Sequence, residues 1–580
     1  MSKGIKRGTL AILAIVLMMG TVLAACGSSS GGETTNTPST SEGSKNTEGN
    51  NATADEPAAG GKADNQVFRM NISTEPPSLD PAQAQDQTSF TVMIGLYEGL
   101  TRMNAAGEAE PAVAESWTTS DDGKTWTFKL RQDAKWSNGD PVTAHDFEYS
   151  WKRTLDPNLN PPAPYAYQLY YIENAAEYNT PDSGLTADQV GVKALDDYTL
   201  EVKLVNPTPY FLSLTSFFTY YPVHKATVEG DPAWATEAAK FVGNGPFNLT
   251  EWTHNDSIKL TKSDTYFDKD AVNFSEVSMA MIAEPQTELN LYNTGELDWA
   301  GGPNGEIPTE QIPVLKNDPE ANLIIQGIAS TYYYNFNNKK KPFDNAKVRK
   351  ALTMAVNRQL LIDKVTLGNQ APAYGFVAAG IKGEKATFRE EVDHTQYFKE
   401  DLEEAKKLWA EGIAEAGWDP ATGFTLLHNT SEGHKKIATA VADMWKSTFG
   451  VNVKIEEQEW AVFLQNRTAL NYDVARAGWG ADYNDPMTFI DMFTSTSGNN
   501  DLGFNNAQYD QLVKDAYATQ DNAERMKLMA QAEKILIGDE MALLPLYYYT
   551  RIWMNKPYVK DVVIDYSGNM DYTRGYIEAH

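Results

Sequence analysis

A change in composition near residue 65 divides the chain into a part that cannot fold alone and a part that can. Residues 27–64 consist mainly of Ser, Thr, Gly, Asn, Glu and Ala, with almost no large apolar side chain. Such a stretch cannot bury enough surface to offset the entropy of ordering. We therefore predict that residues 26–65 form a disordered tether. The 515 or so residues that follow are long enough for two or three domains.

The first 25 residues are predicted to be a secretory signal peptide. A start with three basic residues precedes an apolar stretch from 9 to 22, which is too short to span a membrane and ends in small residues. Cys26 follows at once and is the single cysteine of the chain, so it has no disulfide partner. This ending resembles the lipobox of bacterial lipoproteins. The resemblance implies that Cys26 carries fatty acyl chains such as palmitate and anchors the mature chain on the extracytoplasmic face of the cell membrane. A plain signal peptide with an incidental cysteine is the alternative.

The charge of the chain excludes one class of partner. Its 49 basic and 78 acidic residues give a net charge of -29. Nucleic acid would be repelled by this surplus, and so would an anionic membrane surface. We expect no nucleic-acid partner, and any membrane attachment must come from the lipid anchor.

Periodic patterns after residue 65 predict an α/β protein. Alternating apolar residues predict strands at 67–72, 126–130 and 200–204, the second of them entering a hairpin through the turn at 121–124. Helical spacing predicts helices at 346–365, capped by Asp344 or Asn345, at 401–416, ended by Gly417, and at 434–449, ended by Gly450. A strand at 451–455 follows at once. Helices that alternate with strands indicate an α/β lobe.

The motifs of common enzymes are absent from the sequence. We find no H-E-x-x-H, no C-x-x-C, no phosphate loop and no dinucleotide fingerprint. The seven histidines are scattered without the spacing of a zinc site. A G-x-S-x-G match at 27–31 lies in the tether, without the strand and helix that a nucleophile elbow needs. We therefore expect no cofactor, no metal and no enzymatic activity, and a binding function is favoured.

Four segments carry a resemblance to a known family. Residues 111–117 (PAVAESW), 122–131 (DGKTWTFKLR) and 136–147 (WSNGDPVTAHDF) resemble the signature region of the peptide/nickel solute-binding proteins, family 5. Residues 473–486 (DVARAGWGADYNDP) closely resemble the ligand segment of its oligopeptide-binding members. The likeness extends from about residue 66 to the C-terminus. It implies a class II periplasmic-binding-protein-like α/β fold with two lobes, three structural domains and a ligand cleft between the lobes.

The resemblance also implies how the chain is divided. Matching segments place the first lobe at 66–97, 228–329 and 550–580, an inserted domain at 98–227, and the second lobe at 330–549. Where the chain crosses between lobes we expect a hinge that closes around the ligand.

Three charged residues are implied to bind the ends of a peptide. Asp482 matches the aspartate that pairs with the peptide's α-ammonium group, which would be costly to bury without a counter-charge. Arg476 matches the arginine that meets the carboxylate of short peptides, since a guanidinium fork fits a carboxylate. His434 matches a cation used by longer peptides, whose carboxylate moves by about 3.3 Å per residue. Without the resemblance, Asp482 would be a turn residue, Arg476 part of a surface salt bridge and His434 a capping residue.

Aromatic residues and glycines complete the implied site. Trp460 and Trp479 match the walls of side-chain pockets, and Tyr167 and Tyr549 match contacts near the peptide backbone. Outside the family, aromatic residues at such spacing are more often part of a core. Gly478 belongs to the ligand segment, and Gly480 replaces a bulkier residue of some relatives, which widens a pocket.

One position departs from the family pattern. Where enteric members carry a further lysine for the carboxylate, this chain has Thr366. The preferred peptide length then differs, or Lys364 substitutes.

The chain is therefore predicted to be a monomeric, lipid-anchored receptor that captures short peptides and delivers them to the transmembrane subunits of an ABC permease. Alternatives within the family are receptors for a dipeptide, a murein peptide, nickel or an oligosaccharide, or a sensor of a peptide pheromone. Nickel and sugars are disfavoured because neither presents an ammonium group to Asp482. A secreted hydrolase of peptides or cell wall is the alternative from another class.

Overall fold

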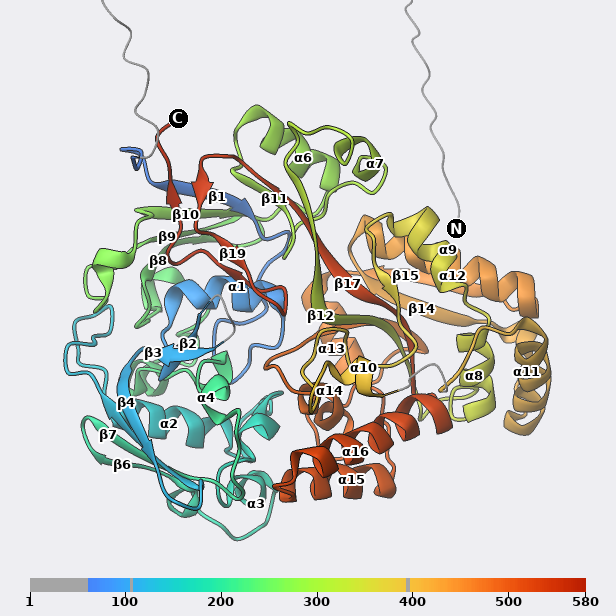
Figure 1. Ribbon diagram of the computed structural model, residues 1–580, viewed down its shortest axis with the longest axis horizontal. Coiled ribbons are helices and arrows are strands. Elements are labelled where there is room, and N and C mark those ends of the chain that lie inside the picture. Colours follow the sequence, from blue (N-terminus) through green and yellow to red (C-terminus); the bar gives the residue numbers. More distant parts are fainter. Residues whose placement is uncertain (1–60, 105–107, 393–396) are drawn as a thin grey trace, which may run out of the picture. The chain divides into compact units, whose positions relative to one another are not determined.

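The computed structural model describes residues 61–104, 108–392 and 397–580 (Figure 1). The predicted signal peptide, Cys26 and most of the predicted tether lie outside these residues. The described α-helices are α1 (Gln87–Leu96), α2 (Ala144–Thr154), α3 (Ala175–Asn179), α4 (Phe211–Leu214), α5 (Lys225–Gly230), α6 (Pro285–Thr294), α7 (Ile312–Leu315), α8 (Ala346–Met354), α9 (Arg358–Leu361), α10 (Phe388–Glu391), α11 (Leu402–Ala416), α12 (Glu432–Phe449), α13 (Trp460–Thr468), α14 (Met487–Ile490), α15 (Ala507–Ala518) and α16 (Asn522–Glu533). None of these described helices combines the length and the apolar character needed to cross a membrane.

Three larger sheets organise the chain. The first is β1 (Val67–Asn71), β10 (Glu276–Ala280), β9 (Ser257–Lys262) and β8 (Phe247–Thr253), in that order. The second, antiparallel throughout, is β4 (Ala114–Thr119), β5 (Thr125–Leu130), β7 (Thr199–Lys203) and β6 (Val192–Asp196). The large sheet is β11 (Trp299–Gly301), β17 (Leu543–Asn555), β12 (Leu323–Phe336), β16 (Val474–Gly480), β14 (Phe424–Asn429) and β15 (Val453–Gln458), with β13 (Ala371–Pro372) beside β17. Short ribbons pair β2 (Thr101–Met103) with β3 (Ala109–Pro111), β18 (Val559–Lys560) with β21 (Tyr576–Ile577), and β19 (Val563–Ile564) with β20 (Met570–Asp571).

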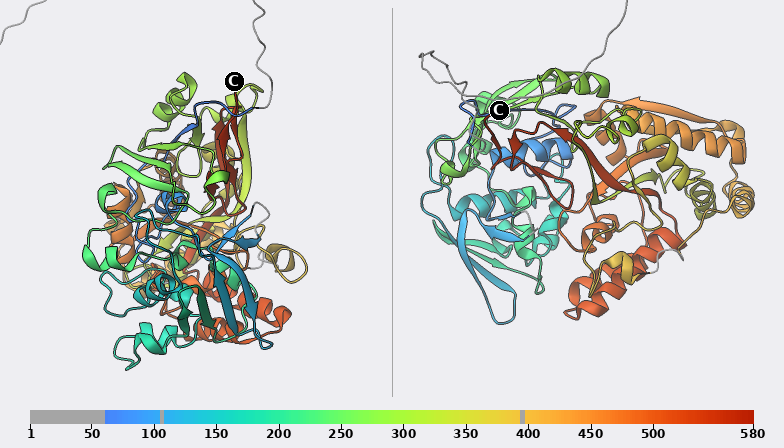
Figure 2. Two further views of the ribbon diagram at one scale, coloured as in Figure 1. Left: turned by 90° about the vertical axis from the view of Figure 1, so that its left-hand side faces the viewer. Right: turned by 45° about the horizontal axis from the view of Figure 1, so that its top comes forward.

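Two long strands, β12 and β17, form the middle of the large sheet. They pair antiparallel from Leu323 opposite Met554 to Asn335 opposite Leu543, and they run side by side in Figure 1 and in the left view of Figure 2. The expected domain boundaries at 329/330 and 549/550 fall inside these strands. The division of the chain into domains remains a prediction.

The strands and helices expected from the sequence are present, but the strand predicted at 451–455 lies at Val453–Gln458 and one helix is divided. The predicted helix 346–365 is divided into α8, α9 and a π-helical turn at Ile362–Thr366. The break occurs because the side chain of Asn357 accepts a hydrogen bond from the backbone N–H of Leu360 (2.8 Å) and begins a new helix. Asn345, one of the two expected caps, caps α8.

Glycines end the two long helices as expected. Gly417 after α11 and Gly450 after α12 adopt the left-handed conformation, with φ of 61° and 70°, a conformation that carries little steric cost only without a Cβ atom. Helix α12 ends there, and the chain enters β15 beside β14 in the same sheet. This helix–strand order places the N-terminus of α12 at the carboxyl end of β14 (Figure 1).

A separate hydrophobic core holds α8, α11 and α12 against the large sheet. Its fully buried members include Tyr332, Leu352, Val441, Trp445 and Val474. Trp445 also donates a hydrogen bond from Nε1 to the carbonyl oxygen of Leu352 (2.8 Å). This packing fixes α12 and β16 relative to each other, and both elements carry residues of the site described next.

Candidate functional site

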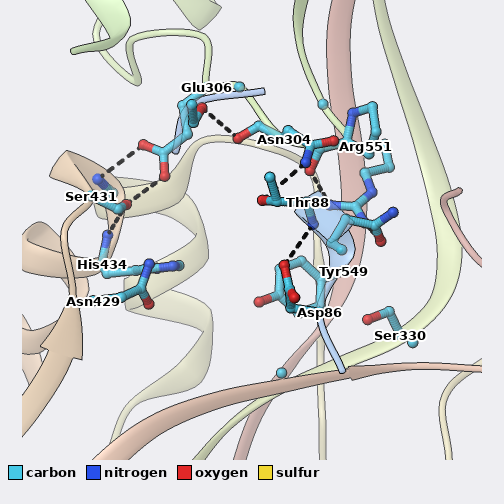
Figure 3. Close-up of a pocket in the computed structure, with 18 of the residues that line it drawn as sticks. Asp86, Thr88, Asn304, Glu306, Ser330, Asn429, Ser431, His434, Tyr549 and Arg551 are labelled. Carbon is cyan, nitrogen blue, oxygen red and sulfur yellow. Dashed lines mark hydrogen bonds between the residues drawn. The ribbon is translucent and has the colours of Figure 1, made fainter. Parts of the chain in front are cut away.

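A cavity of ≈ 490 Å³ is lined by β16, β17, the starts of α1, α12 and α13, and the loop at residues 302–309. Figure 3 shows a part of it, with Glu306, His434, Asn429, Tyr549 and Arg551 among the side chains drawn. The cavity therefore collects residues that lie up to 496 positions apart in the sequence, from Ser73 to Asn569.

Strand β16 forms one wall because of its alternation. Arg476, Gly478 and Gly480 are half-buried and line the cavity, whereas Ala475 and Ala477, on either side of Arg476, are fully buried. A Cβ atom on Gly478 would lie 2.8 Å from the hydroxyl of Tyr549, so a side chain does not fit there. A Cβ atom on Gly480 would meet no atom closer than 3.4 Å. The absence of a side chain at Gly478 leaves the strand's backbone accessible from the cavity.

Strand β16 also has an incomplete partner on one side. It pairs with β12 along its whole length, from Val474 to Gly480. Its pairing with β14 covers only Val474 and Ala475. In the described sheet, the rest of this edge of β16 has no neighbouring strand, and an extended chain can pair with such an edge.

Asp482 lies just beyond β16 and is a carboxyl group without a cation. Its Oδ2 accepts hydrogen bonds from Nε2 of Gln168 (2.7 Å) and from the hydroxyl of Thr488 (3.3 Å). Burial, together with the negative charge of nearby Asp491, raises the pKa of Asp482 well above its usual range. No described Lys, Arg or His forms an ion pair with it. An ammonium group that entered the cavity would relieve this unfavourable state.

Arg476 is the counterpart at the start of the strand. Its Nη2 donates to the hydroxyl of Tyr549 (2.6 Å) and its Nη1 to Oδ1 of Asn429 (3.4 Å). The guanidinium also lies 5.1 Å from the ring centre of Tyr332. No carboxylate of the described residues pairs with Arg476, and its Nε is buried without a hydrogen-bond partner. The cation is thus held in place by neutral groups and is available to an anion.

His434 lies in the first turn of α12, beside Arg476. The hydroxyl of Tyr332 lies 3.3 Å from Nδ1 of His434. Burial and the positive charge of Arg476 lower the pKa of His434 well below its usual range. The imidazole is therefore neutral in the empty cavity, and the expected cation at this position requires that a bound anion raise its pKa.

The two tryptophans line the cavity as expected. Trp460 donates from Nε1 to Oδ1 of Asp86 (3.2 Å), and Trp479 donates from Nε1 to the carbonyl of Thr488 (2.8 Å). Trp479 also stacks on Tyr165, with ring centres 5.8 Å apart. Each indole is therefore anchored by a hydrogen bond and presents the remainder of its surface as wall.

Tyr167 is the exception among the expected site residues. Eight of the nine line the cavity, whereas Tyr167 is buried behind its wall. Its hydroxyl accepts a hydrogen bond from Nδ2 of Asn499 (3.4 Å), and its ring stacks on Tyr165 at 5.8 Å. Tyr165, two residues earlier, is the tyrosine that reaches the cavity. The short 3₁₀ helix at Ala166–Leu169 turns Tyr167 away.

At the departure from the family pattern, Thr366 lines the cavity and Lys364 does not. The Thr366 hydroxyl donates to Oε1 of Gln370 (2.8 Å). Lys364 therefore does not take the place of the family lysine in this structure.

Sequence reasoning missed several polar residues of the cavity, among them Asp86, Asn304, Glu306 and Arg551. Arg551 donates to the carbonyl oxygens of Gly568 and Pro303 and to the side chain of Gln87, each at 3.1 Å. Burial lowers the pKa of Arg551 to about 10, below the usual value for arginine, although the neighbouring Tyr549 acts in the opposite direction. These residues stand in separate loops and strands, so no short motif joins them. No group of His, Cys, Asp or Glu in the described part of the chain could hold a metal ion.

Comparisons with known proteins agree with this geometry. The family model for bacterial extracellular solute-binding proteins, family 5, matches residues 108–501. The oligopeptide-binding protein OppA of Bacillus subtilis is 41% identical over 573 residues, which cover 98% of this chain and 99% of that protein.

Solved structures are equally similar. OppA of Haemophilus influenzae, in complex with the peptide RPPGFSPFR, superposes with a TM-score of 0.84 at 36% identity, covering 89% of this chain and 100% of the other. The murein tripeptide-binding protein MppA of Escherichia coli has a TM-score of 0.81 at 35% identity, covering 90% and 100%. These matches show a two-lobed α/β fold of the periplasmic-binding-protein type.

Proposed function

Because the chain belongs to the family 5 bacterial extracellular solute-binding proteins, we propose that it is a lipid-anchored receptor that captures short peptides by their two charged ends and delivers them to the permease of an ABC importer. The observation that carries the proposal is a pair of ionisable side chains in one cavity that have no ionic partner among the described residues. Asp482 has no described cation and Arg476 no described carboxylate. A peptide zwitterion supplies both missing partners.

In this proposal, the backbone of the peptide pairs with the open edge of β16. The open edge of β16, between Arg476 and Gly480, lies along the wall that joins the two charges. A peptide that adds there as an extended strand gains main-chain hydrogen bonds that do not depend on its side chains. Affinity without strict sequence choice follows from this arrangement.

The side-chain positions of the peptide would face Trp460, Trp479 and Tyr165. These rings are large, and two of them are fixed by hydrogen bonds, so they form walls that exclude water rather than selective contacts. Nickel and sugars are disfavoured as ligands, because neither brings an ammonium group to the unpaired Asp482. A dipeptide, a murein peptide or a peptide pheromone satisfies the same two charges, and these remain candidates within the proposal.

In the cell, the proposal places the mature chain on the extracytoplasmic face of the membrane, held through Cys26. The chain acts as a monomer, closes on its ligand and docks on the transmembrane subunits, and it breaks no bond. Closure follows binding only if the closed form holds the peptide more tightly than the open form.

Native mass spectrometry of the purified mature protein tests the binding function. We expect co-purified peptides, which denaturation releases intact, and their masses give length and composition together. Added peptide that is cleaved by pure protein would favour the hydrolase instead. For the anchor, the mass of the fragment that contains Cys26 shows the acyl chains, and Cys26→Ala should release the protein from the membrane.

A further inference from the structure

A carboxylate of the protein itself lies on the N-terminus of α12. Glu306, in the loop after β11, accepts a hydrogen bond from the hydroxyl of Ser431 and one from the backbone N–H of Gly433 (3.2 Å) (Figure 3). Ser431 is the cap of α12 and accepts from the N–H of His434 (3.0 Å). The carboxylate is therefore linked through one hydroxyl group to the residue that is expected to meet longer peptides.

Hydrogen bonds to the buried side chain of Glu288 hold the loop that carries Glu306 in this position. Glu288, which is 1% exposed, accepts hydrogen bonds from the backbone N–H groups of Gly301 (2.8 Å) and Glu306 (3.1 Å). A Cβ atom on Gly305 would lie 2.1 Å from a Glu288 oxygen, so this close approach requires glycine. The backbone at Glu306 is thus fixed, and its side chain is directed across the cavity.

The start of α12, which contacts the Glu306 carboxylate, also leaves little space. A Cβ atom on Gly433 would lie 3.2 Å from a carboxylate oxygen of Glu306, closer than an ordinary contact. Helix α12 has 18 residues, and the free N–H groups and dipole at its start favour a negative charge. Glu306, Ser431, Gly433 and His434 all line the cavity, on the side of α12.

We propose that Glu306 limits the length of peptide that the receptor accepts, because its carboxylate occupies the place that the carboxylate of a longer peptide must approach. This inference rests on the proposed peptide-binding function. A short peptide ends at Arg476 and leaves Glu306 undisturbed. A longer peptide brings its carboxylate toward His434 and the start of α12, where two negative charges repel each other unless Glu306 moves away. Glu306 acts as a specificity-determining residue, separate from the groups that hold the ligand.

The test compares Glu306→Gln with the unchanged protein, using calorimetry and peptides of one composition from three to six residues. The substitution keeps the size of the side chain and removes its charge. We expect the ratio of affinities, long over short, to rise roughly tenfold. Glu310→Gln is the matched control. It removes the negative charge that pairs with Lys436 of α12 from the same loop (2.9 Å), at a residue that does not line the cavity, and it should leave the ratio unchanged.

Peptides with an amidated C-terminus distinguish an effect of the charge of Glu306 from an effect of the space that its side chain occupies. Long amidated peptides carry no terminal carboxylate, so Glu306→Gln should not improve their binding. If Glu306→Gln raised the affinity for amidated and free peptides equally, the electrostatic role would be refuted. If it lowered the affinity equally for peptides of every length, Glu306 would only connect the two sides of the cavity and would not select for length. A receptor that binds no peptide at all would instead refute the proposed function, with or without the substitution.

Discussion

The two ends of the cavity are built differently. At one end stands a single carboxyl group, Asp482, held by neutral donors. At the other end, Arg476 and His434 offer two nitrogen-bearing groups, and Glu306 adds a negative charge at the start of α12 beside His434. In the proposed binding mode, a single carboxyl group fixes where a peptide begins, whereas two nitrogen-bearing groups allow it to end in more than one place. On this comparison, we expect the amino terminus of the ligand to bind at one fixed place, whereas its carboxyl terminus can bind at more than one. We call the Asp482 end of the cavity the strict end and the Arg476 end the loose end.

The largest expected effect is at the strict end. Asp482→Asn should lower the affinity for peptides by roughly 150- to 5,000-fold, because it leaves a buried ammonium group unpaired at a cost of about 3–5 kcal/mol. The melting temperature of the empty protein should stay equal or rise, since an unpaired buried carboxyl group is removed. Calorimetry and thermal unfolding measure the two quantities.

Asp539→Asn serves as the control for this substitution. Asp539 forms a surface pair with Lys534 (3.7 Å) and lies outside the cavity, so the affinity should not change. If N-acetylated and free peptides bound the unchanged protein with equal affinity, the strict reading of the amino terminus would be wrong.

A second change sharpens the contrast at the loose end. Arg476→Lys keeps the positive charge but loses the fork that donates to Tyr549 and Asn429. We expect roughly 10- to 100-fold weaker binding of tripeptides, in keeping with about 1.5–3 kcal/mol for a hydrogen bond to a charged group. Longer peptides should lose less. A loss that is the same at every length would show that all peptides end at Arg476.

Peptide binding should release a proton at Asp482 and take up a proton at His434, so the two ends of the cavity should depend on pH in opposite directions. Burial and Asp491 raise the pKa of Asp482 in the empty protein, and a bound ammonium group lowers it, so binding releases a proton. Affinity should therefore fall as the pH falls through the raised pKa, by about tenfold per pH unit. His434 behaves in the opposite way: its pKa is low in the empty cavity and rises beside a carboxylate, so longer peptides should take up a proton.

Calorimetry in two buffers with different ionisation enthalpies measures the number of protons exchanged. In Asp482→Asn the proton release should vanish. Uptake by short peptides, or release that survives in Asp482→Asn, would assign the titration to another group, for instance Asp491, whose pKa burial raises to about 7.

The smallest expected effect is at Trp460, which lines the wall of the cavity. Trp460→Phe keeps a ring but removes the hydrogen bond to Asp86. Because this hydrogen bond joins two protein groups and does not involve the ligand, we expect only the net contribution of one ordinary hydrogen bond, about 0.5–1.5 kcal/mol, so affinity should fall by roughly three- to tenfold for peptides of every length. The same substitution in a stopped-flow fluorescence experiment shows whether dissociation becomes faster. An effect confined to one peptide length would place Trp460 at one end rather than along the wall.

Local patterns predicted much of the fold. Gly417 and Gly450 mark helix ends because the left-handed conformation there depends on the residue itself. Strand β16 was not predicted, and its alternation, which places Arg476 and Gly478 on one face, is known only from the structure. The break between α8 and α9 was missed, because Asn357 fits a helix interior and a new cap almost equally well, and only packing decides.

The site was less accessible to sequence reasoning. Arg476 and Asp482 lie in one motif and were found through it. Glu306 and Arg551 contribute from a loop and a strand that are far from that motif in sequence, and tertiary packing alone brings them to the cavity. Tyr167 was expected to contact the ligand, but Tyr165 lines the cavity and Tyr167, in the 3₁₀ turn that follows, does not.

A crystal structure of the mature protein with a bound tripeptide tests the central pairing most directly. The account predicts the peptide's α-ammonium nitrogen at about 2.8 Å from a carboxylate oxygen of Asp482, with the peptide extended along β16. A bound peptide in the reverse direction, or an Asp482 that faces bulk water far from the ligand, would contradict it.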